Sequence, residues 1–310
     1  MQSLPILFLI PVLLAADDPR EYLTADTRLV VNIQVAQVLD ASISKLDIGP
    51  ARAAAEWINQ AAKTLGLDPS KNFERIWIIC GDAYPKGTLV VVQGKFDQDR
   101  LLTRFRELGR ERKQSARVLY EDERTVLNIE ILRAVQAIPG VPASVFVGPA
   151  SAEMLLVAFE KNTLLDALTK RLPKPGPTGA PVTPLLEKLD RTAAVSVAAA
   201  LPSGLTSAQA GLAGAKDLIG TIKLDERITA RCTISMAPGQ SASVLAERLT
   251  RGLKDTRELL PSMAQSTDRG LMAWLSAGLS ATVVEIKNDT VEIKLEMRGI
   301  TADDAAKQRR

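Results

Sequence analysis

A hairpin-like stretch that occurs twice is the feature that most constrains the fold of this chain. The segment SARVLYEDERTV at 115–126 returns as SATVVEIKNDTV at 280–291, with Ser, Ala, Val, Thr and Val in the same register. In each copy, residues that favour strands flank a short polar tip, which is typical of a β-hairpin. Two copies of one hairpin predict a chain built from two related halves.

A strand–strand–helix pattern accompanies these hairpins. It occurs at 73–112, 143–172 and 216–260, and a hairpin follows the first and the last copy. The strands alternate apolar and polar residues, as in TRLVVNIQV at 27–35, and the helices repeat apolar residues every three to four positions. The sequence therefore predicts an α+β fold of two related halves. We expect largely antiparallel sheets, helices on one face of each, and a ferredoxin-like β-α-β-β-α-β order in each half.

A segment rich in proline and glycine separates the two halves. RLPKPGPTGAPVTP cannot readily continue a strand or a helix, which predicts a semi-rigid linker at 172–184. The expected organisation is an N-terminal α+β domain at 17–171, this linker, and a C-terminal α+β domain at 185–310.

The first residues have the composition of a signal peptide. An apolar run, Leu4–Leu14, precedes an Ala-Ala junction and two aspartates. The run fits a signal-peptide core and is too short to span a bilayer. A buried strand or helix is the alternative, which two prolines within the run disfavour. We expect a signal peptide at 1–16, a mature chain that begins near Asp17, no stable transmembrane span after cleavage, and export to the periplasm, cell envelope or medium.

The chain contains no histidine, which removes several classes of functional site. Histidine is the commonest metal ligand and the side chain that titrates near neutral pH. The composition therefore excludes a Ser-His-Asp triad, a Cys-His pair and zinc sites with histidine ligands. No Walker loop, GxGxxG or EF-hand spacing is present either, so we expect no cofactor and no metal.

The balance of charge argues against a nucleic-acid partner. The chain has 39 Lys and Arg against 36 Asp and Glu, a formal net charge of +3. Nucleic-acid binders usually concentrate their basic residues on one stripe. The most basic stretch, Arg100–Arg117, is interrupted by Glu107 and Glu111, so we interpret it as a solvated helix face.

Three motifs could carry chemistry, and each has a structural alternative. Cys80 and Cys232 both lie among apolar strand residues, which predicts buried free thiols; a disulfide is the alternative, and apolar surroundings disfavour a reactive thiol. Ser42–Lys45 fits the S-x-x-K motif of penicillin-binding proteins, but the partner motifs S-D-N and K-T-G are absent. Glu121–Glu123 forms the tip of a hairpin, where solvent leaves carboxylates unsuited to a catalytic pair.

Polar rows on two strands of the C-terminal half form the candidate binding face. They alternate with the apolar residues that helices are expected to cover. The candidate residues are Thr229, Arg231, Thr233, Ser235, Glu292, Lys294, Glu296 and Arg298. A flat face with charges of both signs fits a protein partner or the other half of the chain, and a plain solvated sheet is the alternative.

Several segments resemble a group of uncharacterised exported bacterial proteins, of the kind found in planctomycete-type genomes. The resemblance rests on YLTADTRLVVNIQV, LGLDPSKNFERIWIICGD, GTLVVVQGKFDQDRLLTRF and MLLVAFEKNTLLDAL, and it covers about 27–172. It implies export and an order of elements only, because the group has no established activity. No functional residue can be transferred from it.

Two hypotheses on function follow from these observations. The favoured one is a non-catalytic exported protein of the cell envelope or the secreted space, with a binding or structural role and a protein or envelope component as partner. The alternative is a hydrolase that uses Lys and Ser, or carboxylates, without histidine. A concave pocket that gathers such groups from both halves would favour the hydrolase.

Overall fold

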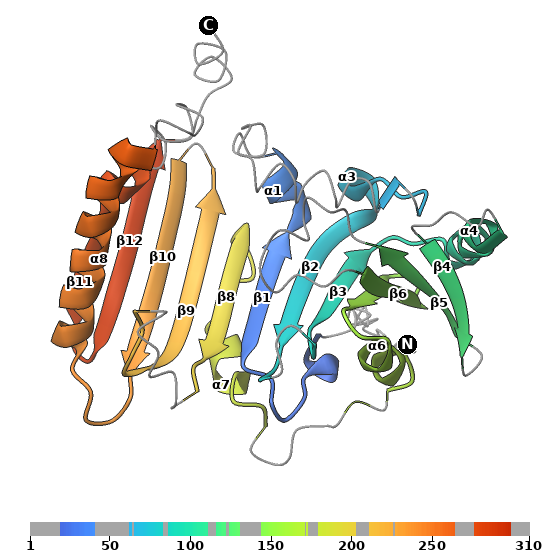
Figure 1. Cartoon of the computed structure of the whole chain (residues 1–310), viewed down its shortest axis with the longest axis horizontal. Helices are drawn as coiled ribbons and strands as arrows, with labels where there is room; N and C mark the ends of the chain where they lie inside the picture. Colours follow the sequence, from blue (N-terminus) through green and yellow to red (C-terminus); the bar gives the residue numbers. More distant parts are fainter. Residues whose placement is uncertain are drawn as a thin grey trace, which may run out of the picture.

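One antiparallel sheet organises the fold (Figure 1). The structure, a computed structural model, describes residues 19–40, 62–63, 65–82, 86–110, 116–121, 124–130, 144–170, 172, 179–202, 211–225, 227–263 and 276–298. The strands lie in the order β11-β12-β10-β9-β8-β1-β2-β3-β7-β6-β5-β4. Their bounds are β1 Leu29–Gln34, β2 Phe73–Cys80, β3 Leu89–Gly94, β4 Ala116–Glu121, β5 Arg124–Glu130, β6 Ser144–Ser151, β7 Met154–Ala158, β8 Val195–Ala200, β9 Ala215–Leu224, β10 Arg227–Met236, β11 Thr282–Lys287 and β12 Thr290–Arg298. The helical elements include η1 Pro19–Tyr22, α1 Val35–Asp40, α3 Pro69–Asn72, α4 Gln98–Arg110, α6 Lys161–Leu168, α7 Thr183–Leu186 and α8 Ala242–Met263.

The first and second parts of the chain meet at a seam between β1 and β8. These strands pair antiparallel from Leu29 opposite Ala199 to Ile33 opposite Val195. A strand left at an edge presents unpaired N–H and C=O groups, so pairing the two edges satisfies both. The expected pair of sheets is therefore found as one continuous sheet.

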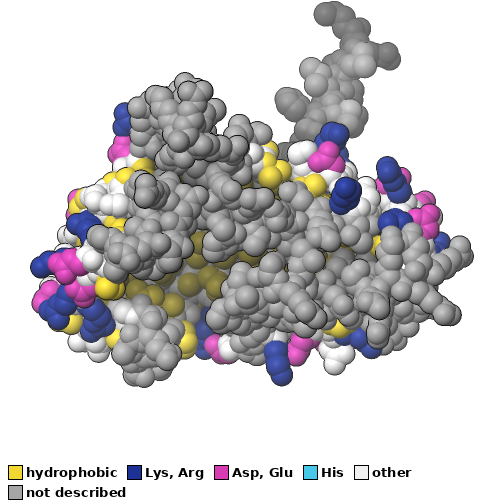
Figure 2. Space-filling view, turned by 45° about the horizontal axis from the view of Figure 1, so that its top comes forward, with side chains coloured by type: hydrophobic (Ala, Val, Ile, Leu, Met, Phe, Trp, Pro, Cys, Tyr) yellow, Lys and Arg dark blue, Asp and Glu magenta, His cyan; other side chains and the backbone are white. Residues whose placement is uncertain are grey.

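One face of this sheet carries α8 and α4, which cover opposite ends. Leu245 of α8 packs with Ile234 and Val291, and Phe105 of α4 packs with Val92, in two separate buried clusters. Figure 2 views this face: charged side chains of both signs gather at the end where α8 lies, and apolar side chains are visible in the recess beside it.

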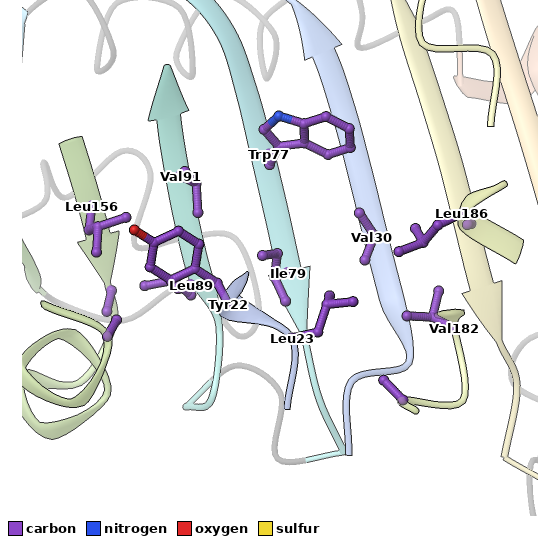
Figure 3. Close-up of a cluster of buried hydrophobic side chains, with 14 of the residues drawn as sticks. Tyr22, Leu23, Val30, Trp77, Ile79, Leu89, Val91, Leu156, Val182 and Leu186 are labelled. Atoms are coloured by element: carbon purple, nitrogen blue, oxygen red, sulfur yellow. The ribbon is translucent and has the colours of Figure 1, made fainter. Parts of the chain in front are cut away.

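The opposite face holds the largest buried cluster, over β1, β2, β3, β7 and β8 (Figure 3). Tyr22 of η1, Leu164 of α6 and Leu186 of α7 cover it, and Trp77 lies within it at 2% exposure. Helical segments thus cover both faces of the sheet over the first part of the chain. The expectation of helices on one face only is wrong there, because β2, β3 and β7 carry apolar residues on both sides.

The ferredoxin-like order is not confirmed. Strands β1, β2 and β3 are direct antiparallel neighbours in a meander, and the β6–β7 hairpin lies between β3 and β5. The coarser prediction, an α+β fold with largely antiparallel pairing, is confirmed.

The register predicted for the two similar hairpins is wrong by one residue. Glu121 opposite Arg124 closes the first turn, and Lys287 opposite Thr290 closes the second, so Thr290 matches Arg124 rather than Thr125. Val126 consequently packs in the cluster under Tyr22, whereas Val291 packs under α8, on the other face. A shift of one residue reverses the facing of every side chain.

The structure describes residue 172 and residues 179–184 of the predicted linker. Residues 173–178 and the predicted signal peptide at 1–16 lie outside the described residues. The end of the linker segment is packed, because Ala180 and Val182 are buried in the large cluster and Thr183 begins α7. In the described part of the chain, no helix combines the length and the apolar character that a membrane span requires.

Candidate functional site

The structure brings the predicted polar residues together on one face of the sheet. In the β10–β12 pair, Arg231 lies opposite Lys294, and Thr233 lies opposite Glu292. Because side chains alternate along a strand, these residues point away from the face that α8 covers. Thr229 and Ser235 belong to the same row on β10, opposite Glu296 and Thr290. Arg298 ends β12 opposite Arg227, and its side chain lies outside the described residues.

This candidate binding face is hollowed. A cavity of about 550 Å³ lies over β9, β10 and β12, floored by Thr221, Thr233 and Lys294 among others. The chain that follows α7 supplies Lys188 and Asp190 to its wall. Most of the predicted row therefore lines one concave surface, while Glu292 and Ser235 stand beside it.

Ion pairs neutralise most of the charge on this face. Glu292 pairs with Lys287 at 3.1 Å and with Lys294 at 3.4 Å, and Lys294 also pairs with Glu285. Hydrogen bonding by Lys287 lowers the pKa of Glu292, and hydrogen bonding to Glu285 raises the pKa of Lys294. Both groups therefore stay ionised near neutral pH.

The wall of the hollow is held by a second network. Asp190 accepts hydrogen bonds from the hydroxyl of Thr192 at 2.6 Å and from its backbone N–H at 3.0 Å, and it pairs with Lys223 at 3.1 Å. The Thr192 hydroxyl, followed by Lys223, lowers the pKa of Asp190 to about 2. Arg231 and Lys188 form no ion pair with the described residues, so they give the hollow its positive character.

A second hollow, of about 370 Å³, lies on the same face over β1, β2 and β3. Gln34, Arg75 and Gln93 line it and are register neighbours across three strands. The guanidinium carbons of Arg75 and Arg191 lie 5.7 and 5.8 Å from the ring centroid of Trp77. This site was not predicted from the sequence, although the alternation in β2 places Arg75 and Trp77 on one face of the strand.

Buried polar atoms continue from this hollow along the seam. Asn32, which lies opposite both Trp77 and Ser196, is fully buried. Its amide nitrogen donates to the Ser196 hydroxyl at 3.3 Å, and its Oδ1 has no protein partner among the described residues. A buried acceptor without a partner is costly, so Asn32 is a polar exception beside the large apolar cluster.

The motifs considered for catalysis assemble no site in the described residues. Cys80 and Cys232 are free thiols on strands separated by three others, about 19 Å at the usual strand spacing. Burial raises the pKa of both thiols, that of Cys232 to about 11. Ser42–Lys45 lies outside the described residues, as do the side chains at the 121–123 tip. No three acidic or cysteine residues gather as metal ligands in the part of the chain that the structure describes.

Comparison with known proteins identifies a fold neighbour. No family model and no curated protein matches the chain. The crystal form III structure of TP0453 matches with a TM-score of 0.50 and 10% sequence identity, over 94% of this chain and 97% of that one. The chain shares its fold with TP0453. Crystal form I of TP0453 matches at 10% identity with a TM-score of 0.49, over 95% and 97%. A likeness at this identity carries no function across.

Proposed function

We propose that this chain is an exported, non-catalytic binding protein of the cell envelope or the secreted space. It binds a polar protein or envelope component in the hollow of the candidate binding face, without a cofactor and without nucleic acid. The observation that carries the proposal is the meeting of β9, β10 and β12 with the chain after α7 around one cavity of about 550 Å³.

The charges of this hollow favour binding over hydrolysis. A hydrolase without histidine needs a lysine that loses its proton, or a carboxyl that keeps one, near neutral pH. Here the pKa of Lys294 is raised, and those of Glu292 and Asp190 are lowered. These shifts fix the charges instead of preparing a proton transfer. The hollow does gather lysines and carboxylates, as the hydrolase alternative requires, but their pKa values move in the wrong direction for it.

A duplicated architecture is part of the proposal. Outward from the seam, the sheet runs β8-β9-β10-β12-β11 on one side, and β1-β2-β3-β5-β4 on the other once the β6–β7 hairpin is set aside. Helix α8 connects β10 to β11 as α4 connects β3 to β4. This parallel supports two related halves at the level of topology. The sequence match between the hairpins adds nothing, because their registers differ.

Site-specific crosslinking in the native host tests the binding role. A photo-crosslinking amino acid at Thr233 lies in the hollow, and one at Val244, which is 54% exposed on α8, lies on the opposite face. We expect a discrete adduct from Thr233 only, reduced at least tenfold by Arg231→Glu and unaffected by Arg251→Glu on α8. Identical adducts from both positions, or none from Thr233, would contradict the proposal.

Export is tested on the same material. Mass spectrometry of the protein from its own host should show a mature chain that begins near Asp17. Soluble cytoplasmic protein that retains Met1 would overturn the proposed compartment and leave the binding face untouched.

A further inference from the structure

We propose that Arg75, which lines the second hollow, and Arg191, whose guanidinium group lies over the same Trp77 ring, together bind the oxyanion of a ligand, a carboxylate or a phosphate group. This site lies over β1, β2 and β3, whereas the proposed partner site lies over β9, β10 and β12. The inference does not rest on the proposed function, and either one can fail alone.

Two positive charges converge on one buried ring. Both guanidinium groups lie within 6 Å of the Trp77 centroid, and the indole is 2% exposed. Neither arginine forms an ion pair in the described part of the chain. The face of an aromatic ring attracts one cation, but it does not remove the repulsion between two. An oxyanion that contacts both guanidinium groups would offset this repulsion. The planar guanidinium group of arginine also matches the geometry of a carboxylate or a phosphate.

Arg75 also has a buried hydrogen-bond donor that no described protein group satisfies. Its Nε is buried and has no protein partner in the described residues. Burial, followed by the nearby charge of Arg191, lowers the pKa of Arg75 from its ordinary value. A buried donor without an acceptor is a cost that most proteins avoid, and a bound anion supplies the acceptor.

Glutamine side chains hold the loop and the ring that frame this site. Gln34 donates from Nε2 to the backbone carbonyl of Arg191 at 2.5 Å, and Trp77 donates from Nε1 to Gln93 at 2.9 Å. Gln34 and Gln93 flank Arg75 on the neighbouring strands. The Arg191 backbone and the Trp77 ring are therefore fixed before a ligand arrives, which lowers the entropy cost of binding.

A bulge in β2 aims Arg75 into the hollow. The register with β3 shifts between Phe73 and Arg75, so Glu74 is the extra residue. Bulges of this kind re-aim side chains and are common beside functional sites. The backbone at Gly94 of β3 lies so close to Asn72 that no side chain fits there: a Cβ would lie 1.8 Å from the carbonyl oxygen of Asn72.

The rim of the hollow carries charges of both signs. Glu74, Glu153 and Lys95 are exposed there, and neither carboxylate forms an ion pair with Arg75 or Arg191 in the described part of the chain. The charges that line the hollow balance, with Arg75 and Lys95 against Glu74 and Glu153, and Arg191 adds a positive charge beside Trp77. Arg191 shifts the pKa of Arg75 more than the exposed carboxylate of Glu74 does, because solvent screens that carboxylate, so the positive charge of Arg75 is only partly compensated.

Trp77 itself reports occupancy. In a variant with Trp57→Phe and Trp274→Phe, Trp77 is the one remaining tryptophan of three. Fluorescence is followed during titration with sodium phosphate, sodium acetate and phosphatidylglycerol vesicles, each at constant ionic strength. We expect a saturable change with phosphate or acetate. Saturation by vesicles at a much lower phosphate concentration would assign the oxyanion to a lipid headgroup.

Matched variants decide whether the arginines are responsible. Arg75→Gln and Arg191→Gln should each weaken the titration at least tenfold, whereas Arg251→Gln on α8 should leave it unchanged. If Arg75→Gln lowers the melting temperature strongly, Arg191→Gln decides, because its side chain lies on a loop. The proposal is overturned by the absence of saturation with all three probes. It is equally overturned by a titration that survives the arginine variants, or by an equal loss in the α8 variant.

Discussion

The carboxylate of Asp190 fixes the loop at 187–194, between α7 and β8, which contributes residues to both candidate sites. It accepts from the hydroxyl and the N–H of Thr192, and Gln37 donates to the carbonyl of Thr192 at 3.0 Å. Arg191 therefore leaves the loop in one direction, toward Trp77, while Lys188 and Asp190 face the other hollow. One acidic residue thus couples the geometry of two candidate sites.

The stability that this loop supplies should depend on pH in a defined range. The folded pKa of Asp190 is about 2, below its ordinary value of 3.8. A lowered folded pKa stabilises the folded state above the unfolded pKa, and that contribution is lost as pH falls through the folded pKa. In urea unfolding, the difference between wild type and Asp190→Asn should be complete at pH 5, fall most steeply below pH 4, and be largely lost at pH 2. Thr192→Val removes the main cause of the shift and should move the loss to higher pH. A difference that persists unchanged to pH 2 would contradict this account.

The polar rows on β10 and β12 could be predicted at the level of single residues, while Arg75 and Asn32 could not. A period of two identifies which residues share a face, and this was sufficient for Arg231 and Lys294. It does not tell whether that face is covered. The polar side of β1 that carries Asn32 shows the same alternation, yet Asn32 is buried, and the apolar cluster on this side includes Leu186 of α7, which follows far along the chain. No local pattern contains that information.

The bulge in β2 is an element-scale device that one glycine should control. A Cβ at Gly94 meets backbone, which cannot swing aside as a side chain could. Gly94→Ala should therefore destabilise the protein by roughly 3 kcal/mol and disturb the Trp77 environment. Gly252→Ala is the matched control, because Gly252 lies in α8 with nothing within 4 Å of its added Cβ. That control should stabilise by about 1 kcal/mol. Urea unfolding of both variants checks the pair, and similar effects of equal sign would refute the bulge argument.

Single elements were the most predictable level of this fold. Strands were recognised from the alternation of apolar and polar residues, and helices from apolar residues every three to four positions. Asp97 precedes α4, and its side chain accepts from the N–H of Arg100 at 3.0 Å, as an N-terminal cap does. The structure of the linker was harder to predict. Proline and glycine indicate that no long helix or strand forms, but they do not indicate whether the segment packs against the core. Val182, Leu185 and Leu186 are apolar at the spacing of one helical turn, and they are buried.

At the scale of the whole molecule, the seam between β1 and β8 decides whether the two parts of the chain unfold together or separately. The sequence of a strand does not show whether both of its edges are paired or one is left open. One continuous sheet could therefore not be distinguished from two separate sheets. The largest cluster spans the seam: Val30 of β1 and Ala198 of β8 pack with Leu186 of α7. Because the same apolar core holds both parts of the chain, they should not unfold independently.

The two cysteines can test this cooperativity in one experiment. Cys80 reports on β2 and Cys232 on β10, on opposite sides of the seam. Burial raises the pKa of both thiols, so the folded protein should resist a short pulse of alkylating reagent at pH 8, and each thiol should react as its strand unfolds. Pulse alkylation in increasing urea, read by mass spectrometry, should give one midpoint for both residues. Val30→Ala, at the seam, should lower both midpoints equally by removing about 2 kcal/mol of packing, whereas Val244→Ala on the exposed side of α8 should change neither. If Cys232 reacts at lower urea than Cys80, or Val30→Ala shifts Cys80 alone, the sheet consists of two units that unfold separately and the seam is only an interface between them.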